Sequence, residues 1–178
     1  MALEWKVRRI TEADLETAAT WLNTHFANDP ESGGTAGSQK VQKLRDALAS
    51  GTSIWVLLAK VGGQWRLYGV LRGQEQGEMI KDGVRRTFWF FNLLATQYDI
   101  PSDRRLEVAD HLTCEFLKDA IAAGKVRDYI RIEGPSKSAG ARYARDFLGC
   151  EEFRRGDLSY FLKPFMDIVE GPHSRGVY

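Results

Sequence analysis

A nearly continuous apolar stretch in the middle of the chain, Thr-Phe-Trp-Phe-Phe-Asn-Leu-Leu-Ala-Thr at 87–96, constrains the fold more than any other feature. Successive side chains of a strand point to opposite faces, so apolar residues at consecutive positions need cover on both faces. The stretch is far too short to span a bilayer as a helix. It therefore predicts a central strand in a sheet with helices packed on both sides.

Hydrophobic periodicity and turn residues assign the rest of the chain. The expected elements are strand 5–10, helices 15–26 and 41–48, strands 54–61, 64–72 and 87–96, a helix ending near Gly124, strand 128–133, a helix ending at Gly149, and strands 150–153 and 158–165. Gly62-Gly63 suits the tight turn of a hairpin, and 73–83 is expected to be a loop or a frayed strand extension. This order predicts an α/β (α+β) fold with a single mixed, mostly antiparallel sheet and helices on both faces.

One domain is expected, because 178 residues suffice for one complete core. We place it at 1–165 and expect an extension at 166–178, because apolar residues there are too few to pack. Pro30 and three glycines make 28–37 an expected loop, and Ser38 is expected to cap the following helix.

Composition excludes several classes of function. The net charge of +1 and the lack of a recognition motif argue against nucleic-acid binding. No apolar run resembles a signal peptide or a membrane span, so a cytoplasmic protein is expected. The histidines lack metal-ligand spacing, and we expect no metal. Cys114 and Cys150 suit small buried residues, while Cys114 with His111, three residues away, stays open as a nucleophile pair.

The segment Arg104-Arg105-Leu106-Glu107-Val108-Ala109 stands between the central strand and the next helix. Backbone N–H groups and the positive end of a helix bind phosphate at such a junction. Together with the order of elements, the segment resembles the GNAT superfamily of acetyl-CoA-dependent N-acyltransferases, over roughly 5–165. Family members carry Gln/Arg-x-x-Gly-x-Gly/Ala here, of which Arg104 and Ala109 match, while Glu107 replaces a glycine.

The resemblance implies a cofactor and the residues that bind it. Acetyl-CoA would lie between the fourth and fifth strands, with its pyrophosphate on the 104–109 segment. Glu107 would place a negative charge beside that pyrophosphate and weaken binding. The cofactor-binding residues that follow are Leu93, Leu94, Ala95, Arg104, Arg105, Leu106, Glu107, Val108, Ala109 and Ser138.

A second family pattern, Asn-x-x-Ala-x-x-x-Tyr-x-x-Leu-Gly-Phe, is matched at Ala141, Leu148 and Gly149. Ser138 replaces its asparagine, and Arg145 replaces the tyrosine that protonates the leaving thiolate in the family. Arginine stays protonated and cannot serve as that acid, although it can stabilise a thiolate.

Other proton-transfer groups are also considered. Tyr143 is the nearest tyrosine, but its position on the helix predicts that it faces the core. The fourth strand has no carboxylate, so Glu133, and with similar standing Asp99, are the candidate bases.

Two hypotheses of function follow. The first is N-acetyl transfer from acetyl-CoA to an unknown amine. The second is a non-catalytic GNAT-like module, for example a phage virion-associated protein located in the virion, because the usual acid, base and glycine are all replaced. Either hypothesis allows a homo-oligomer or a larger assembly, with an amine substrate or a protein partner that the sequence does not identify.

Overall fold

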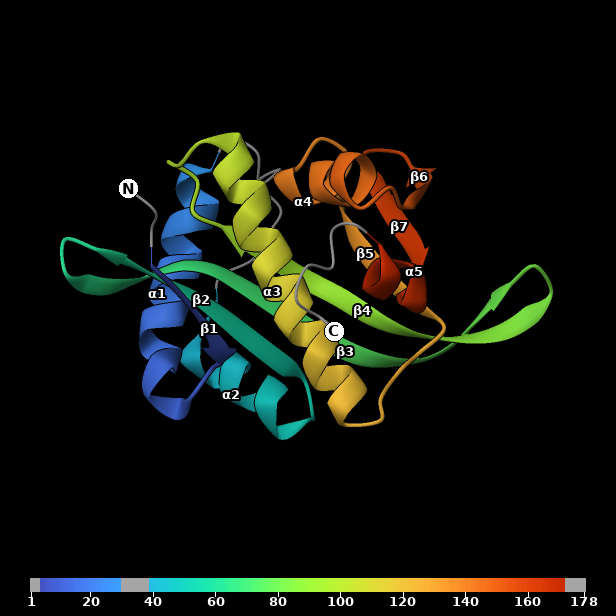
Figure 1. Cartoon of the computed structure of the whole chain (residues 1–178), viewed down its shortest axis with the longest axis horizontal. Helices are drawn as coiled ribbons and strands as arrows, with labels where there is room; N and C mark the ends of the chain where they lie inside the picture. The colour runs from blue at the N-terminus through green and yellow to red at the C-terminus, as the bar shows by residue number, and fades with distance from the viewer. Residues whose placement is uncertain (1–3, 30–38, 172–178) are drawn as a thin grey trace.

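A computed structural model, described here for residues 4–29 and 39–171, shows a seven-stranded sheet flanked by helices (Figure 1). The strand order is β1-β2-β3-β4-β5-β7-β6, and β4 and β5 form the one parallel pair among these strands. The strands are β1 Trp5–Arg9, β2 Ser53–Val61, β3 Gln64–Lys81, β4 Val84–Thr96, β5 Tyr129–Pro135, β6 Glu151–Arg155 and β7 Leu158–Pro164. The helices are α1 Leu15–Asn28, α2 Val41–Ala49, α3 Ser102–Ala122, α4 Ala139–Arg142 and α5 Phe165–Glu170, with a 3-10 turn at Glu12–Asp14 and a π-helical turn at Tyr143–Phe147. The predicted element order and fold class are confirmed.

The sheet separates two apolar clusters, which explains why β4 is apolar on both faces. One face packs against α1 and α2, where Leu22 and Leu44 meet Val56 and Val70. The other face packs against α3, α4 and α5. There Phe116 of α3 makes edge-to-face contacts with Trp89 and Phe91 at 5.0 and 4.9 Å. Gly69 and Gly73 of β3 let α3 approach closely, because a Cβ at either would lie 2.6 Å from a side-chain atom of α3.

A bulge in β4 marks the point at which β4 and β5 separate. Arg72 of β3 is opposite Leu93 and Gly73 is opposite Phe91, so Asn92 is the extra residue. The parallel pairing with β5 ends at the same place, with Phe91 opposite Ile132. The rest of β4 therefore has no strand partner on its β5 side.

The segment after Arg72 is a strand extension rather than a loop. β3 continues to Lys81 and forms a long hairpin with β4, which projects from the body of the sheet (Figure 1). Asp82 and Gly83 close it with φ of 53° and 75°, as a tight primed turn requires.

The prediction that an extension begins at residue 166 is wrong. Residues 165–170 form α5, in which Phe165, Ile168 and Val169 are buried against the α3 side of the sheet. Three apolar residues on one face suffice to bury a short helix, so the packed domain continues past residue 165. The rest of the predicted extension, 172–178, lies outside the described residues, as do Ser38 and most of the predicted 28–37 loop.

Candidate functional site

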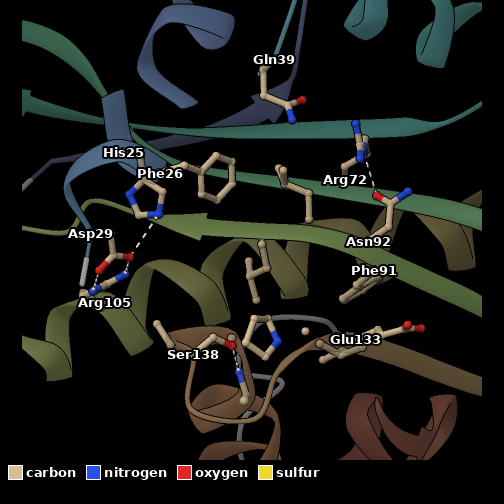
Figure 2. Close-up of a pocket in the computed structure, with 18 of the residues that line it drawn as sticks. His25, Phe26, Asp29, Gln39, Arg72, Phe91, Asn92, Arg105, Glu133 and Ser138 are labelled. Carbon is tan, nitrogen blue, oxygen red and sulfur yellow. Dashed lines mark hydrogen bonds and ion pairs between the residues drawn. The ribbon is translucent and has the colours of Figure 1, made fainter. Parts of the chain in front are cut away.

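A cavity of about 310 Å³ opens where β4 and β5 separate. We call it the main cavity. Its walls come from α1 and α2 on one side and from β5 and the start of α4 on the other (Figure 2). It is lined by His25, Phe26, Asp29, Gln39, Lys43, Arg72, Phe91, Asn92, Leu93, Leu94, Arg105, Ile132, Glu133, Gly134, Pro135, Ser138, Ala139, Gly140 and Ala141.

A buried polar cluster forms one end of the main cavity. Arg105 of α3 donates to Asp29 Oδ2 at 2.8 Å and, through Nε, to the Thr96 hydroxyl at 2.9 Å. His25 Nε2 lies 3.3 Å from the same Asp29 oxygen (Figure 2). The side chains of Asp29 and Arg105 are only 1% and 7% exposed, so this ion pair is largely shielded from solvent. It ties the end of α1 to the start of α3.

His25 is held neutral by this environment. Burial lowers the pKa of His25 to about 4, which the Asp29 charge opposes and the Arg105 charge reinforces. The ring stacks on Trp21 at 5.2 Å and meets Phe26 edge-on at 5.1 Å. At pH 7 the imidazole is therefore uncharged, with Nε2 facing the Asp29 carboxylate.

A second polar group lies at the β4 bulge. Arg72 of β3 donates through Nε to Asn92 Oδ1 at 2.7 Å. Gln39 lies on the same side of the strands (Figure 2). Asn23 of α1 fixes its backbone, accepting from Gln39 N at 2.7 Å and donating to Gln39 O at 2.9 Å. Desolvation lowers the pKa of Arg72 from its usual value.

The predicted phosphate-binding segment 104–109 lies within α3 and not before its start. α3 begins at Ser102 and its first internal bond runs from Arg105 N to the Pro101 carbonyl, so the N–H groups of Leu106, Val108 and Ala109 are inside the helix. The N–H groups without a bond inside the helix are those of Ser102, Asp103 and Arg104. Pro101 ends the connection that follows β4, and α3 begins at the next residue, Ser102.

The side chains of the predicted cradle have other partners. Arg105 points inward to Asp29, and Val108 and Ala109 belong to the core. Glu107 lies one turn into α3, where it accepts from Arg104 at 2.6 Å. Glu107 therefore does not occupy a phosphate loop, and the predicted repulsion loses its structural basis.

A small crevice of about 20 Å³ separates the first turns of α3 from α4. Tyr143, Leu94, Ser102 and Arg142 are among the residues that line it. Tyr143 itself is 1% exposed, and its hydroxyl donates to Thr113 Oγ1 at 3.0 Å. Burial raises the pKa of Tyr143 well above its usual value, and the Asp110 charge adds to this. The expectation that Tyr143 faces the core is confirmed.

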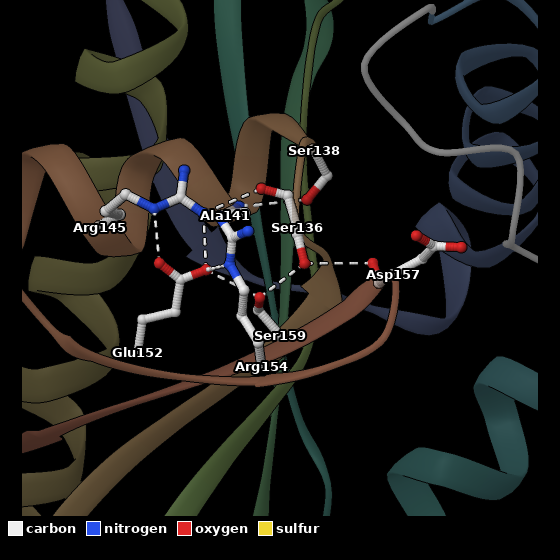
Figure 3. A network of polar contacts seen from close by, with 8 residues as sticks. All are labelled: Ser136, Ser138, Ala141, Arg145, Glu152, Arg154, Asp157 and Ser159. Atoms are coloured by element: carbon white, nitrogen blue, oxygen red, sulfur yellow. Dashed lines mark hydrogen bonds and ion pairs between the residues drawn. The ribbon is translucent and has the colours of Figure 1, made fainter.

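Arg145 belongs to a polar network between α4 and the β6–β7 pair rather than to the main cavity (Figure 3). Its Nε and Nη2 each donate to the Glu152 carboxylate at 2.8 Å, and Nη2 also donates to the Ser136 carbonyl at 2.9 Å. Ser159 donates to the same carboxylate at 2.8 Å. The Arg145 guanidinium lowers the pKa of Glu152 to about 2, and Ser159 contributes. A role for Arg145 at a thiolate would require this network to open.

The other predicted residues are placed as follows. Leu93, Leu94 and Ser138 line the main cavity, and Ser138 caps α4 by accepting from Ala141 N at 3.2 Å. Ala95 points into the α1–α2 core instead. Glu133 lies at the β5 side of the cavity, where its carboxylate points away from His25 and accepts from Arg131 at 3.1 Å (Figure 2).

Three further predictions concern reactive groups. Asp99 accepts from Gln97 at 2.8 Å and does not line the main cavity. Burial raises the pKa of Cys114 and of Cys150 to about 12, so Cys114 is a protonated thiol at neutral pH and the pair with His111 lacks its nucleophile. Within 4–29 and 39–171, no group of three or more His, Cys, Asp and Glu residues is arranged to hold a metal ion.

Sequence reasoning missed His25, Asp29, Lys43 and Arg72 as site residues. For two of them, His25 and Arg72, the sequence does contain a signal. His25 falls three residues after Leu22 on the buried face of α1, and Arg72 is a charge in an otherwise apolar part of β3. A polar residue on an apolar face indicates a partner or a cavity, and here both are present.

Lowering the pH from 7 to 5 is expected to remove roughly 2 kcal/mol of the free energy of unfolding through His25. The unfolded imidazole binds a proton near pH 6.5, whereas the buried one does so only near pH 4. The unfolded state therefore binds more protons between these values, and stability falls as the pH falls. Urea denaturation at several pH values measures this dependence.

Two variants control the measurement. His25→Gln is expected to flatten the dependence between pH 7 and 5, while His111→Gln, at an exposed position, is expected to keep it. The lowered pKa of Glu152 changes the free energy of unfolding mainly below pH 4.5, the usual pKa of a glutamate, which lies outside the range from pH 7 to 5. Equal slopes in His25→Gln and the unmodified protein would contradict the assignment.

Comparison with solved structures gives the fold class. The chain is similar to a GNAT-family acetyltransferase from Staphylococcus aureus Mu50, with TM-score 0.63, 14% identity, and coverage of 91% of this chain and 99% of that one. It is similar to a ribosomal-protein-alanine N-acetyltransferase from Brucella melitensis, with TM-score 0.59, 16% identity, and coverage of 89% and 99%. It is also similar to yncA from Salmonella typhimurium, solved with its cofactor acetyl-CoA, with TM-score 0.62, 12% identity, and coverage of 90% and 94%.

These likenesses show that the chain has the GNAT fold. No family model matches the sequence, and no curated protein matches it. In the described part of the chain, every helix is too short or too polar to cross a membrane.

Proposed function

We propose that the protein is an acyl-CoA N-acyltransferase that holds acetyl-CoA in the opening between β4 and β5. The observation that carries the proposal is the coincidence of three features at one place: the bulge at Asn92, the end of the β4–β5 pairing at Phe91 and Ile132, and the main cavity. An open strand edge beside a cavity offers backbone groups that an extended, amide-containing ligand can bind.

The residues present fit such a cofactor. Residues 92–96 of β4 have no strand partner on their β5 side, so the backbone groups that face the opening suit the amides of a pantetheine arm. Ser102, Asp103 and Arg104 present free N–H groups at the positive end of α3, which suits a pyrophosphate. Leu93 and Leu94 supply apolar walls. Asp103 is the one unfavourable charge in this turn.

Acetyl-CoA supplies an acyl group activated as a thioester. The chain itself contributes position and polarity. The bulge residue Asn92 has no opposite partner on β3, so its backbone N–H is suited to polarise a carbonyl oxygen. The main cavity holds the acceptor amine next to that carbonyl group. Holding the two reactants close together makes the largest contribution to the rate. Glu133 and neutral His25 are the cavity groups that can accept a proton from the amine.

A thiol-release assay with acetyl-CoA over a panel of amines, amino acids and peptides tests this function. Turnover is expected for at least one class of amine, with a rate lowered by Glu133→Gln. Tyr143→Phe is expected to keep the rate of the folded enzyme, because the buried hydroxyl bonds to Thr113 and not to the main cavity. Loss of turnover in Tyr143→Phe with unchanged stability would instead make Tyr143 the acid.

A non-catalytic binding module is the second candidate. The observation that favours it is that Tyr143 and Arg145, which stand at or near the acid position, are both engaged in contacts within the fold. A virion-associated role remains a prediction from the family resemblance. Saturable CoA binding without thiol release from any amine would support this candidate.

A further inference from the structure

Two cations line the main cavity without a carboxylate partner in the described part of the chain. Arg72 has one hydrogen bond, from Nε to Asn92, and Lys43 of α2 has none. The other charges of the cavity are neutralised in pairs, Arg105 by Asp29 and Glu133 by Arg131. The lining itself has three cations and two carboxylates, and because Arg131 outside the lining neutralises Glu133, two cations remain unpaired at the cavity. Cations without a carboxylate partner in a partly closed cavity favour the binding of an anionic ligand.

The geometry of Arg72 narrows the class of anion. Asn92 accepts from Nε and fixes the guanidinium plane, which leaves Nη1 and Nη2 without a partner among residues 4–29 and 39–171. Two parallel N–H groups match the two oxygens of a carboxylate. One fork and one exposed ammonium are few donors for a phosphate, which has three terminal oxygens and a higher charge.

The position of Arg72 relates this anion to the reaction. Arg72 pairs with Leu93, directly beside the Asn92 bulge where β4 and β5 part. Figure 2 shows it on the same side of the strands as Gln39, with Glu133 and Ser138 across the opening. A ligand whose anionic end meets Arg72 therefore has its other end at the opening between the strands.

We propose that the main cavity binds an acceptor amine that carries a carboxylate, held by the Nη1 and Nη2 groups of Arg72 with support from Lys43. Free amino acids are the simplest members of this substrate class. The reaction of this class with acetyl-CoA rests on the proposed function, whereas the binding of its carboxylate does not. The carboxylate fixes the acceptor so that its amine faces the β4–β5 opening.

Calorimetric titration of the twenty amino acids and their carboxamides, without any CoA, tests the binding site. At least one amino acid is expected to bind, and its carboxamide to bind at least about 10-fold more weakly, as loss of a charged hydrogen-bond pair implies. Arg72→Met is expected to abolish this preference for the carboxylate. Arg72→Lys, which keeps the charge but not the fork, should retain part of it. Arg66→Met is the matched control, because Arg66 is an exposed arginine on the same strand.

Each outcome decides for or against the site. Binding that prefers the carboxylate, lost in Arg72→Met and kept in Arg66→Met, supports the proposal even if CoA never binds. Equal affinity for acids and carboxamides, or no binding across the panel, overturns it. Preference for phosphoethanolamine over every carboxylate also overturns it. A failure of the proposed acyl transfer appears separately, as absent CoA binding or thiol release.

Discussion

Replacing Asp29 with alanine is expected to lower the free energy of unfolding by ~3–5 kcal/mol. The substitution removes the carboxylate that Arg105 contacts at 2.8 Å, in a place where both side chains are almost fully shielded from water. A buried guanidinium without this carboxylate retains its desolvation cost and loses its compensation. Urea denaturation at pH 7 measures the effect, with Asp46→Ala on the exposed side of α2 as control, expected within about 0.5 kcal/mol of the parent.

A double variant separates charge from packing. Asp29→Leu combined with Arg105→Met removes both charges at similar volume and is expected to recover most of the lost stability, since apolar replacements of buried ion pairs are often neutral. A cost below about 1 kcal/mol for Asp29→Ala would show that the pair does not connect α1 to α3 as described.

Replacing Ser102 with proline is expected to weaken CoA binding by about 10- to 100-fold, while leaving the stability of the fold unchanged. Proline is tolerated at the first helical position, where it removes only an N–H that makes no bond inside the helix. Pro101 has φ −54° and ψ 146°, the extended conformation that a residue before proline adopts. The expected loss is that of one charge-assisted hydrogen bond to phosphate, roughly 1.5–3 kcal/mol.

Ser102→Ala is the matched control, because it removes the hydroxyl and keeps the N–H. Isothermal titration of CoA into both variants gives the comparison. If both variants lose affinity equally, the side chain and not the backbone binds the ligand. If neither loses affinity, the start of α3 does not bind the pyrophosphate.

The sequence predicts the fold well because the local patterns here agree with the tertiary structure. The two-faced apolar strand is β4, and the Gly62-Gly63 turn closes β2 and β3 with φ of 58° and 80°. Strand and helix periods are local properties, so they survive without an alignment. The motif match at Arg104 and Ala109 predicts a phosphate-binding segment at 104–109, whereas Pro101 marks the start of α3 locally and leaves the N–H groups of Ser102, Asp103 and Arg104 without a bond inside the helix.

The site is less predictable because it depends on approaches between distant segments. Asp29 and Arg105 are 76 residues apart in the chain, and no local pattern shows that they meet. Arg145 occupies a position of the family pattern, but its ion pair with Glu152 depends on how the 143–147 turn packs against β6. The pair between Glu133 and Arg131 is local, because both residues lie two positions apart on β5. Arg72 became recognisable as a site residue only when the main cavity around it was known.

Titration calorimetry of the unmodified protein with acetyl-CoA and with CoA tests the central claim most directly. The account predicts saturable binding of one molecule per chain for both ligands, because the open edge of β4 and the free N–H groups of Ser102, Asp103 and Arg104 are present without rearrangement. Pantetheine, which lacks the pyrophosphate, should bind more weakly, because it loses the contact with the N–H groups at the start of α3. No saturable heat up to millimolar CoA would contradict the claim that this fold serves as an acyl-CoA enzyme.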